Sequence, residues 1–271
     1  MSFTENKAFK QRSPYAIFED EVCRADTMRS LISDKELNYL KRNQFIGALE
    51  LHIIRIVTQF KLINAKQLYD LLCLQYKNIT KYQLDVSVKK LCNKSFLHRI
   101  VMSRKDVCTL RYVYAIGIHA HTVFPEAVFS TDVLCMDIHR LKRTLATNQL
   151  VISALKEYGP FNFSSSGIKL LKDKGMTRLF SYDSLLHIDD MSYYALVLRK
   201  VPDWEKNFCD SLELIGILTR EEVCKIVAVC EDSEQSDTAS MHITDLNDYV
   251  IVVYDRELHL NGFKSCVEKN K

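Results

Sequence analysis

The stretch Asn64–Lys94, NAKQLYDLLCLQYKNITKYQLDVSVKKLCNK, decides the fold of the N-terminal half of the chain. Asn64 and Thr80 are residue types that cap helix N-termini, and Gln83 completes a capping box three residues after Thr80. Apolar residues then recur at helical spacing; they are Leu68, Leu71 and Leu72 in the first segment and Leu84, Val88 and Leu91 in the second. The stretch therefore predicts two helices, Ala65–Leu74 and residues 81–94, joined by a turn at 75–79.

The flanking sequence extends this pair of helices to a larger motif. Apolar spacing predicts another helix over Arg42–Phe60. Alternating residues predict strands over Phe96–Met102 and Val107–Ile116, with a turn at 103–106. Three helices followed by a β-hairpin is the order of a winged helix-turn-helix domain, which we expect over residues 41–125. In such domains the third helix enters the major groove of DNA.

The expected DNA contacts lie at the start and outer face of the third helix and at the hairpin tip. Lysine and arginine side chains there would neutralise phosphates, Gln83 would contact adenine through its amide, and Tyr82 would contact the backbone. The candidate residues are Thr80, Lys81, Tyr82, Gln83, Lys89, Lys90, Ser103, Arg104 and Lys105. The alternative that this motif contacts protein stays open.

Charge is distributed unevenly along the chain. Residues 41–112 carry 14 Lys/Arg and 4 Asp/Glu, net +10, whereas residues 181–260 carry 6 and 17, net −11. The basic block is typical of a nucleic-acid-binding module. The acidic block would repel phosphate and indicates a protein partner.

The remaining segments flank these two blocks. Residues 1–40 are expected to be an N-terminal extension, with a helix that begins at a Ser33 capping box. Residues 126–178 are expected to be a helical linker with one helix over His139–Tyr158, stopped by Gly159-Pro160, and a short basic helix over Gly167–Asp173.

The C-terminal half reads as an acidic α/β domain over residues 179–260, followed by a tail at 261–271. Apolar runs predict strands that are covered on both faces, and a helix and a polar loop lie between them. The expected strands are 178–188, 193–201, 225–230 and 249–254, the helix is 203–218, and the loop is 232–240. The fold class expected of the whole chain is thus α+β, and this half is expected to dimerise or to recruit a protein.

The order of elements resembles the replication-relaxation family of Gram-positive plasmids and mobile elements. A winged helix is followed by a linking helix, then by a strand with an aspartate, SYDSLL at 181–186, and a second apolar strand, YYALVLRK at 193–200. The resemblance spans about residues 45–255 and implies that the C-terminal half has a fold like PD-(D/E)xK nucleases. It also implies a role in plasmid or mobile-element replication, transfer or transcription.

This sequence departs from the nuclease pattern of that resemblance. No proline precedes Asp183, and the second strand carries no carboxylate. Hydrolysis of a phosphodiester with Mg²⁺ needs at least two oxygen ligands placed together. Asp189 and Asp190 are expected in a hairpin turn. We therefore predict no enzyme activity, no metal and no cofactor, with a nuclease that uses Asp183 beside Asp189 or Asp190 as an alternative.

Other features exclude several classes of protein. No run of 18 apolar residues or secretory leader is present, so neither a membrane partner nor secretion is expected. Nine scattered cysteines without a CxxC pair indicate reduced thiols in the cytoplasm, with Cys224 and Cys230 buried. His119 and His121 would share one face of a strand but lack a third ligand. The sequence predicts a non-enzymatic, cytoplasmic protein that binds double-stranded DNA; an adaptor that binds only proteins is the alternative.

Overall fold

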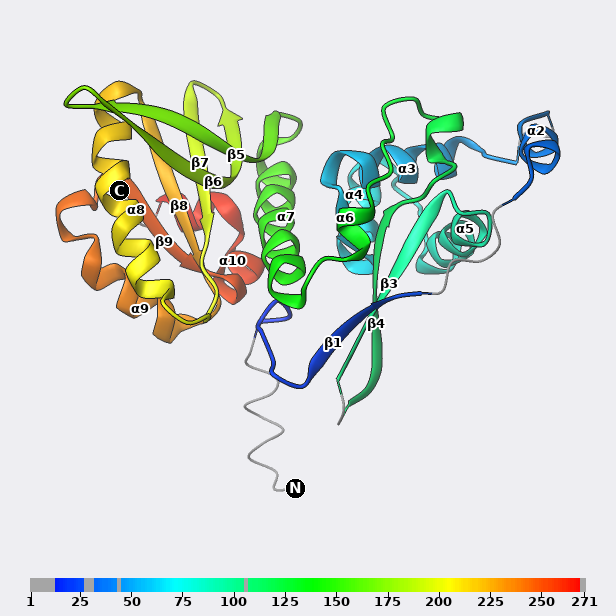
Figure 1. The fold of residues 1–271 in the computed structure, drawn as a ribbon, viewed down its shortest axis with the longest axis horizontal. Helices are drawn as coiled ribbons and strands as arrows, with labels where there is room; N and C mark the ends of the chain where they lie inside the picture. Colours follow the sequence, from blue (N-terminus) through cyan, green and yellow to red (C-terminus); the bar gives the residue numbers. More distant parts are fainter. Residues whose placement is uncertain (1–12, 27–31, 43–44, 105–106, 269–271) are drawn as a thin grey trace. The chain divides into compact units, whose positions relative to one another are not determined.

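The computed structural model describes residues 13–26, 32–42, 45–104 and 107–268, which form two compact units of mixed α+β structure (Figure 1). One unit is Phe18–Leu141, and the other combines Met1–Ile17 with Lys142–Lys271. The division corrects the expected boundaries. Most of residues 18–40 belongs to the first unit rather than to a separate extension, and residues 126–178 are divided between the two units instead of forming a linker.

The first unit contains the three helices that apolar spacing predicts. They are α3 (Ala48–Phe60), α4 (Ala65–Gln75) and α5 (Lys81–Asn93), preceded by α2 (Asp34–Arg42). Each buries its predicted apolar face. The first of the three begins six residues later than expected, because Gly47 is its N-cap and the Glu50 carboxylate accepts the Gly47 N–H at 3.0 Å.

Four antiparallel strands complete the first unit in the order β1-β3-β4-β2. The strands are β1 (Glu21–Ala25), β2 (Leu62–Asn64), β3 (Leu97–Arg104) and β4 (Val107–Ile116). The hairpin of β3 and β4 is confirmed, whereas β1 and β2 were not expected. Val113 of β4 lies opposite Ile100 on one side and Asn64 on the other. The hairpin is therefore hydrogen-bonded to the segment that caps α4.

The second unit is built on a five-stranded sheet in the order β5-β6-β7-β8-β9. The strands are β5 (Asn162–Asp173), β6 (Met176–Ile188), β7 (Met191–Val197), β8 (Cys224–Cys230) and β9 (Val250–Tyr254). The first three pair antiparallel and the last three parallel. The short helix expected at 167–173 is wrong. This segment pairs with β6 and alternates, with Leu171 buried and Leu170 exposed.

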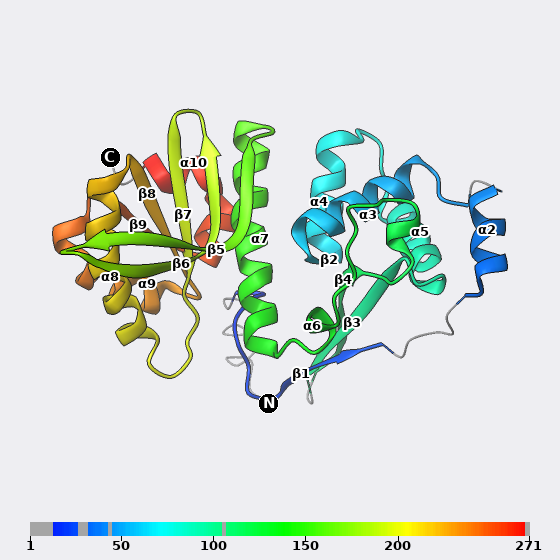
Figure 2. The same ribbon diagram turned by 45° about the horizontal axis from the view of Figure 1, so that its top comes forward.

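Helices cover both faces of this sheet. They are α7 (Ile138–Tyr158), α8 (Trp204–Glu221), α9 (Ser233–His242) and α10 (Asp255–Glu268). Figure 2 shows α8 and α9 on one face, with α7 and α10 on the other. The loop expected at 232–240 is the helix α9, because Asp232 caps it by accepting the Gln235 N–H at 3.0 Å. The expected tail at 261–271 overlaps α10.

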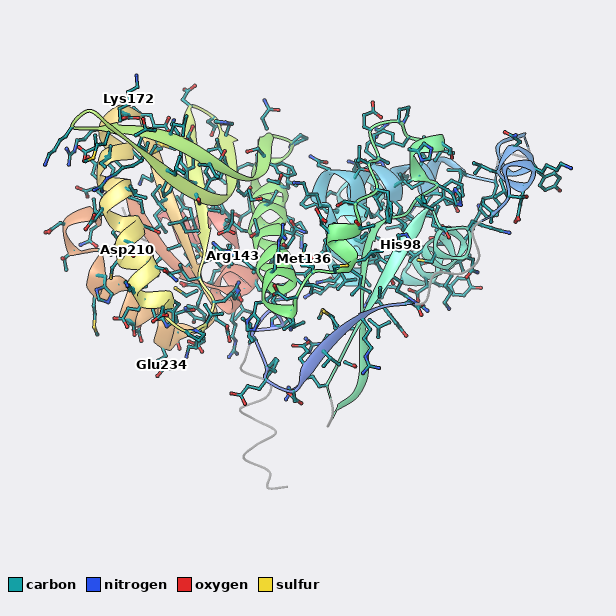
Figure 3. All side chains as sticks on the ribbon, in the orientation of Figure 1. His98, Met136, Arg143, Lys172, Asp210 and Glu234 are labelled. Carbon is teal, nitrogen blue, oxygen red and sulfur yellow. The ribbon has the colours of Figure 1, made fainter. Side chains whose placement is uncertain are left out.

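The paired histidines do not share the face of a strand. His119 precedes a 3-10 turn, η1 (Ala120–Thr122), and His121 lies inside it, with its Nδ1 2.8 Å from the Ile118 carbonyl oxygen. The ring of His98 on β3 (Figure 3) is buried near His119, with its centroid 5.2 Å from that of Phe129. Burial lowers the pKa of His98, and the charge of His119 lowers it further.

The buried His98 ring should make the first unit sensitive to acid. The folded state keeps the ring neutral where the unfolded chain, with a pKa near 6.5, takes up a proton. The free energy of unfolding should therefore fall as pH drops below about 6.5. Hydrogen exchange of β3 amides between about pH 7.5 and pH 5.5, corrected for intrinsic rates, measures this. His98→Phe should reduce the pH dependence; an unchanged dependence would contradict the assignment to His98.

Candidate nucleic-acid interface

Helix α5 has one buried face and one exposed face. Leu84, Ser87, Val88 and Leu91 are buried. On the opposite face Tyr82 is 77% exposed, Val86 is 46% exposed, and Lys89 is also exposed. These three residues are spaced by four and three positions, so they form one line along the helix. We call Tyr82, Val86 and Lys89 the outer line of α5.

The N-terminus of α5 is a complete capping box. The Thr80 Oγ1 accepts the Gln83 N–H at 3.2 Å, and the Gln83 Oε1 accepts the Thr80 N–H at 2.9 Å. The sequence predicted that Gln83 contacts adenine through both amide atoms. Its oxygen serves the cap instead, so a bidentate contact with a base would require the capping box to open.

The predicted basic residues separate into two groups. Lys81 and Lys89 are exposed, and the Lys81 Nζ lies 5.8 Å from the centre of the Tyr69 ring. Lys90 instead forms an ion pair with Glu50 at 3.2 Å and lies 4.5 Å from the centre of the Phe45 ring. The ammonium group of Lys90 therefore has an internal partner.

The hairpin arm shows the same internal pairing. Arg104 donates from Nε to Asp20 Oδ1 at 3.0 Å, and its guanidinium lies 4.0 Å from the centre of the Phe18 ring. Ser103, half-buried, pairs with Val22 of β1. Lys105 falls outside the described residues. Among the candidate DNA contacts in the hairpin, the Arg104 guanidinium thus already has partners within the protein, Asp20 and Phe18.

Glu50 connects α3 to α5. Its carboxylate accepts from the Gly47 N–H at 3.0 Å, from the Ser87 hydroxyl at 3.1 Å and from the Lys90 ammonium at 3.2 Å. Burial alone would raise the pKa of Glu50, but the bonds from Lys90 and the backbone outweigh burial and lower it. A charge-assisted network thus fixes the orientation of α5 about its own axis.

Sequence reasoning missed the acidic partners of the basic block. Asp26 pairs with Arg99, and Glu36 pairs with Lys94 at 2.5 Å, in addition to Asp20 with Arg104. The three acidic residues precede residue 41, so they lie outside residues 41–112, the block with a net charge of +10. The whole unit Phe18–Leu141 carries 18 Lys/Arg and 13 Asp/Glu, net +5. The exposed lysines of α5 therefore make up a larger share of the net positive charge of this unit than the sequence indicated.

Asp183 of β6 lies against α7. Its two oxygens accept from Arg143 Nε at 2.6 Å and Nη2 at 2.9 Å, and Oδ2 also accepts the Val197 N–H at 2.7 Å. Asp189 has φ +52° in the turn between β6 and β7, as the sequence predicted. Within the described residues, no group of three or more His, Cys, Asp and Glu side chains could hold a metal ion.

Two further sequence predictions concern thiols and membranes. Cys224 and Cys230 carry free thiols and are buried as expected. Burial raises the pKa of Cys224 to about 11 and that of Cys230 to about 12, so both remain thiols at neutral pH. Over the described residues, no helix is long and apolar enough to cross a membrane.

Comparisons with known proteins leave the family open. No family model and no curated protein matches the sequence. A search of solved structures found protein VC1899 from Vibrio cholerae, with 10% identity and a TM-score of 0.32. The match covers 92% of this chain and 58% of that protein. A likeness at this score supports no conclusion about function.

The Glu50 network should contribute measurably to stability. Glu50→Gln keeps the shape of the side chain but removes its charge, and we expect it to lower the free energy of unfolding by about 1–2 kcal/mol. Because the pKa of Glu50 is lowered, this contribution is present above about pH 4.5 and is lost as pH falls through the lowered value. Urea unfolding of both proteins at neutral pH and near pH 3 checks this. A difference that persists at the lower pH would contradict it.

The Arg143–Asp183 pair should be structural. Asp183→Asn is expected to lower the free energy of unfolding by about 1–2 kcal/mol. The reason is that the carboxylate is largely buried and its oxygens accept hydrogen bonds from three N–H groups. Urea unfolding measures the loss, with Asp190→Asn in the exposed turn as the matched control. Cleavage of DNA with Mg²⁺ that Asp183→Ala abolishes would overturn this interpretation and favour the nuclease alternative.

Proposed function

We propose that Phe18–Leu141 is a winged-helix domain that binds double-stranded DNA, with α5 in the major groove. The observation that carries the proposal is the outer line of α5, which leaves Tyr82, Val86 and Lys89 exposed at the start and middle of the third helix. The order α3, α4, α5 and then the β3–β4 hairpin supports it, because this order places the third helix for contact with DNA.

The chemistry of this face suits a duplex. Lys81 and Lys89 can neutralise phosphates, and the Val86 side chain can contact a thymine methyl group in the major groove. Tyr82, at the first turn of the helix, can donate its hydroxyl to a phosphate. Lys90 and Arg104 would contribute only if their pairs with Glu50 and Asp20 opened. We therefore expect few phosphate contacts from the described residues and moderate affinity.

The second unit supplies the other half of the proposed function, a contact with protein. Ile168, Leu170 and Leu179 lie on the outer face of β5 and β6 and are each about 60% exposed, and Leu170 and Leu179 are cross-strand partners. Exposed apolar side chains grouped on a sheet mark interaction surfaces. This face would bind a protein partner or a second copy of the chain.

The resemblance noted in the sequence suggests the process. A DNA-binding unit joined to a protein-binding unit fits an accessory factor of plasmid or mobile-element replication, transfer or transcription, with no catalytic activity of its own. The apolar β5–β6 face also favours the alternative function of an adaptor in which both units bind protein.

Salt-dependent binding of random-sequence duplex DNA separates these two functions. Fluorescence anisotropy across a salt series should show affinity that falls steeply with salt for the unaltered chain. Lys81→Glu with Lys89→Glu should weaken binding at least tenfold and reduce the slope of log K against log salt by about 2.

The matched control makes the same change of charge in the other unit. Lys172 and Lys174 are exposed at the tip of the β5–β6 hairpin, where Figure 3 shows Lys172 pointing away from the sheet. Lys172→Glu with Lys174→Glu should leave the affinity within about twofold of the unaltered chain. No binding by the unaltered chain at low salt, or equal loss in both variants, would refute α5 as the DNA-binding face and leave the adaptor function.

A further inference from the structure

The segment Ser13–Ile17, here called the strap, is buried in the second unit although it precedes the whole of the first unit in sequence. Ser13 is 4% exposed, Tyr15 5% and Ala16 1%. In sequence, Phe18–Leu141 separates the strap from the rest of the second unit. The burial of the strap therefore depends on its contacts with the other residues of the second unit.

The strap lies across the carboxyl ends of parallel strands. Glu231 follows β8 directly, and Asp255 follows β9. The Ser13 hydroxyl donates to Asp255 Oδ2 at 2.5 Å, and the backbone N–H of Ile17 donates to the Glu231 carboxylate. Beyond the end of β7, Arg199 donates from Nη2 to Asp255 Oδ1 at 3.0 Å. The carboxyl ends of parallel strands are where open α/β sheets bind ligands.

Helix α7 contacts the strap from another side. The Lys142 ammonium donates to the Pro14 carbonyl oxygen at 3.2 Å, and the Tyr15 hydroxyl donates to Gln149 Oε1 at 2.9 Å. Both α7 side chains are buried, Lys142 completely. Four buried polar side chains from separate parts of the second unit thus contact four of the five residues of the strap.

This pattern is that of a binding site rather than of simple packing. Burial of a charge costs free energy unless it is paired, and an apolar surface would cover a chain segment without any charge. Here a hydroxyl, a carbonyl oxygen, an aromatic hydroxyl and a backbone N–H each meet a matching partner. The site therefore matches a hydroxyl side chain at Ser13 and a tyrosine side chain at Tyr15, whereas the contacts at Pro14 and Ile17 are with the backbone.

We propose that the carboxyl edge of β8 and β9, with Lys142 and Gln149 of α7, is a peptide-binding site that the strap occupies in cis. The strap is a displaceable ligand, and a separate peptide with a hydroxyl residue two positions before a tyrosine competes for its place. This inference does not depend on DNA binding by α5.

Displacement would alter the connection between the units. The chain passes from one unit to the other twice, after Ile17 and at the beginning of α7. With the strap bound, both passages are anchored in the second unit; with the strap released, only the passage at α7 is. A peptide in trans would therefore change how freely the two units move, without a contact to the first unit.

The test uses the full chain and a synthetic peptide of residues 13–19, SPYAIFE. A fluorescent form of this peptide should bind saturably, and an excess of the unlabelled peptide should speed hydrogen exchange at Tyr15, Ala16 and Ile17. Peptides with alanine in place of Ser13 or phenylalanine in place of Tyr15 should bind more weakly, because each loses one hydrogen bond to a buried group.

A mild substitution in the full chain tests the same site without the peptide. Tyr15→Phe removes only the hydroxyl bonded to Gln149 and should speed exchange of the strap amides about fivefold, whereas β8 amides keep their rate. Tyr82→Phe, the same change at an exposed tyrosine of α5, is the control. Strap amides that exchange at the rate of β8 amides, or peptide binding that leaves the strap unchanged, would overturn the proposal.

Discussion

The carboxylate of Glu50 determines which face α5 presents to solvent. One side chain accepts the N–H that begins α3 and also accepts from Ser87 and Lys90 on α5. Because Ser87 and Lys90 then face α3, helical geometry directs Tyr82, Val86 and Lys89 away from the unit. The choice of Lys89 rather than Lys90 as an exposed cation follows from this network, and with it the chemistry that the helix offers to a partner.

The same network shows why charge counted along the chain overstates the charge of the fold. Residues 41–112 are strongly basic, yet β1, α2 and their flanks bring Asp20, Asp26 and Glu36 to arginines and a lysine of that block. The pairs are local in space and distant in sequence, as for Asp20 and Arg104, which are 84 residues apart. A partner with phosphate groups would be attracted by the net charge of the whole unit, which is smaller than that of residues 41–112. It would bind best at basic side chains that do not pair with an acidic residue.

Much of the secondary structure could be predicted because its causes are local. The capping box of Thr80 and Gln83 uses residues three positions apart, and apolar periodicity marks the buried faces of α4 and α5. Strands β8 and β9 were predicted because a strand covered on both faces needs an unbroken apolar run. The winged-helix assignment stays a prediction, since element order alone does not establish it.

The elements that the sequence did not predict have either distant causes or weak local signals. Strand β1 has no alternation of its own to mark it and is defined by pairing with β3. Helix α9 is too polar to show a periodic face, and its N-terminal cap at Asp232 resembles an ordinary loop residue. The sequence likewise showed that Asp183 lacks the second carboxylate of a metal site, but its partner Arg143 lies on another element, where residue spacing gives no sign of the pair.

The domain boundaries predicted from the sequence differ from the two units for a related reason. Composition divides a chain into consecutive blocks, whereas this chain enters the second unit twice, first with Ser13–Ile17 and again from Lys142. Ser13 and Asp255 are 242 residues apart and share a hydrogen bond. A segment that returns to a distant body must be recognised by it through specific groups, since chain proximity contributes little over such a length. The buried polar partners of the strap are what that recognition requires, and a site that recognises one segment in cis can recognise another in trans.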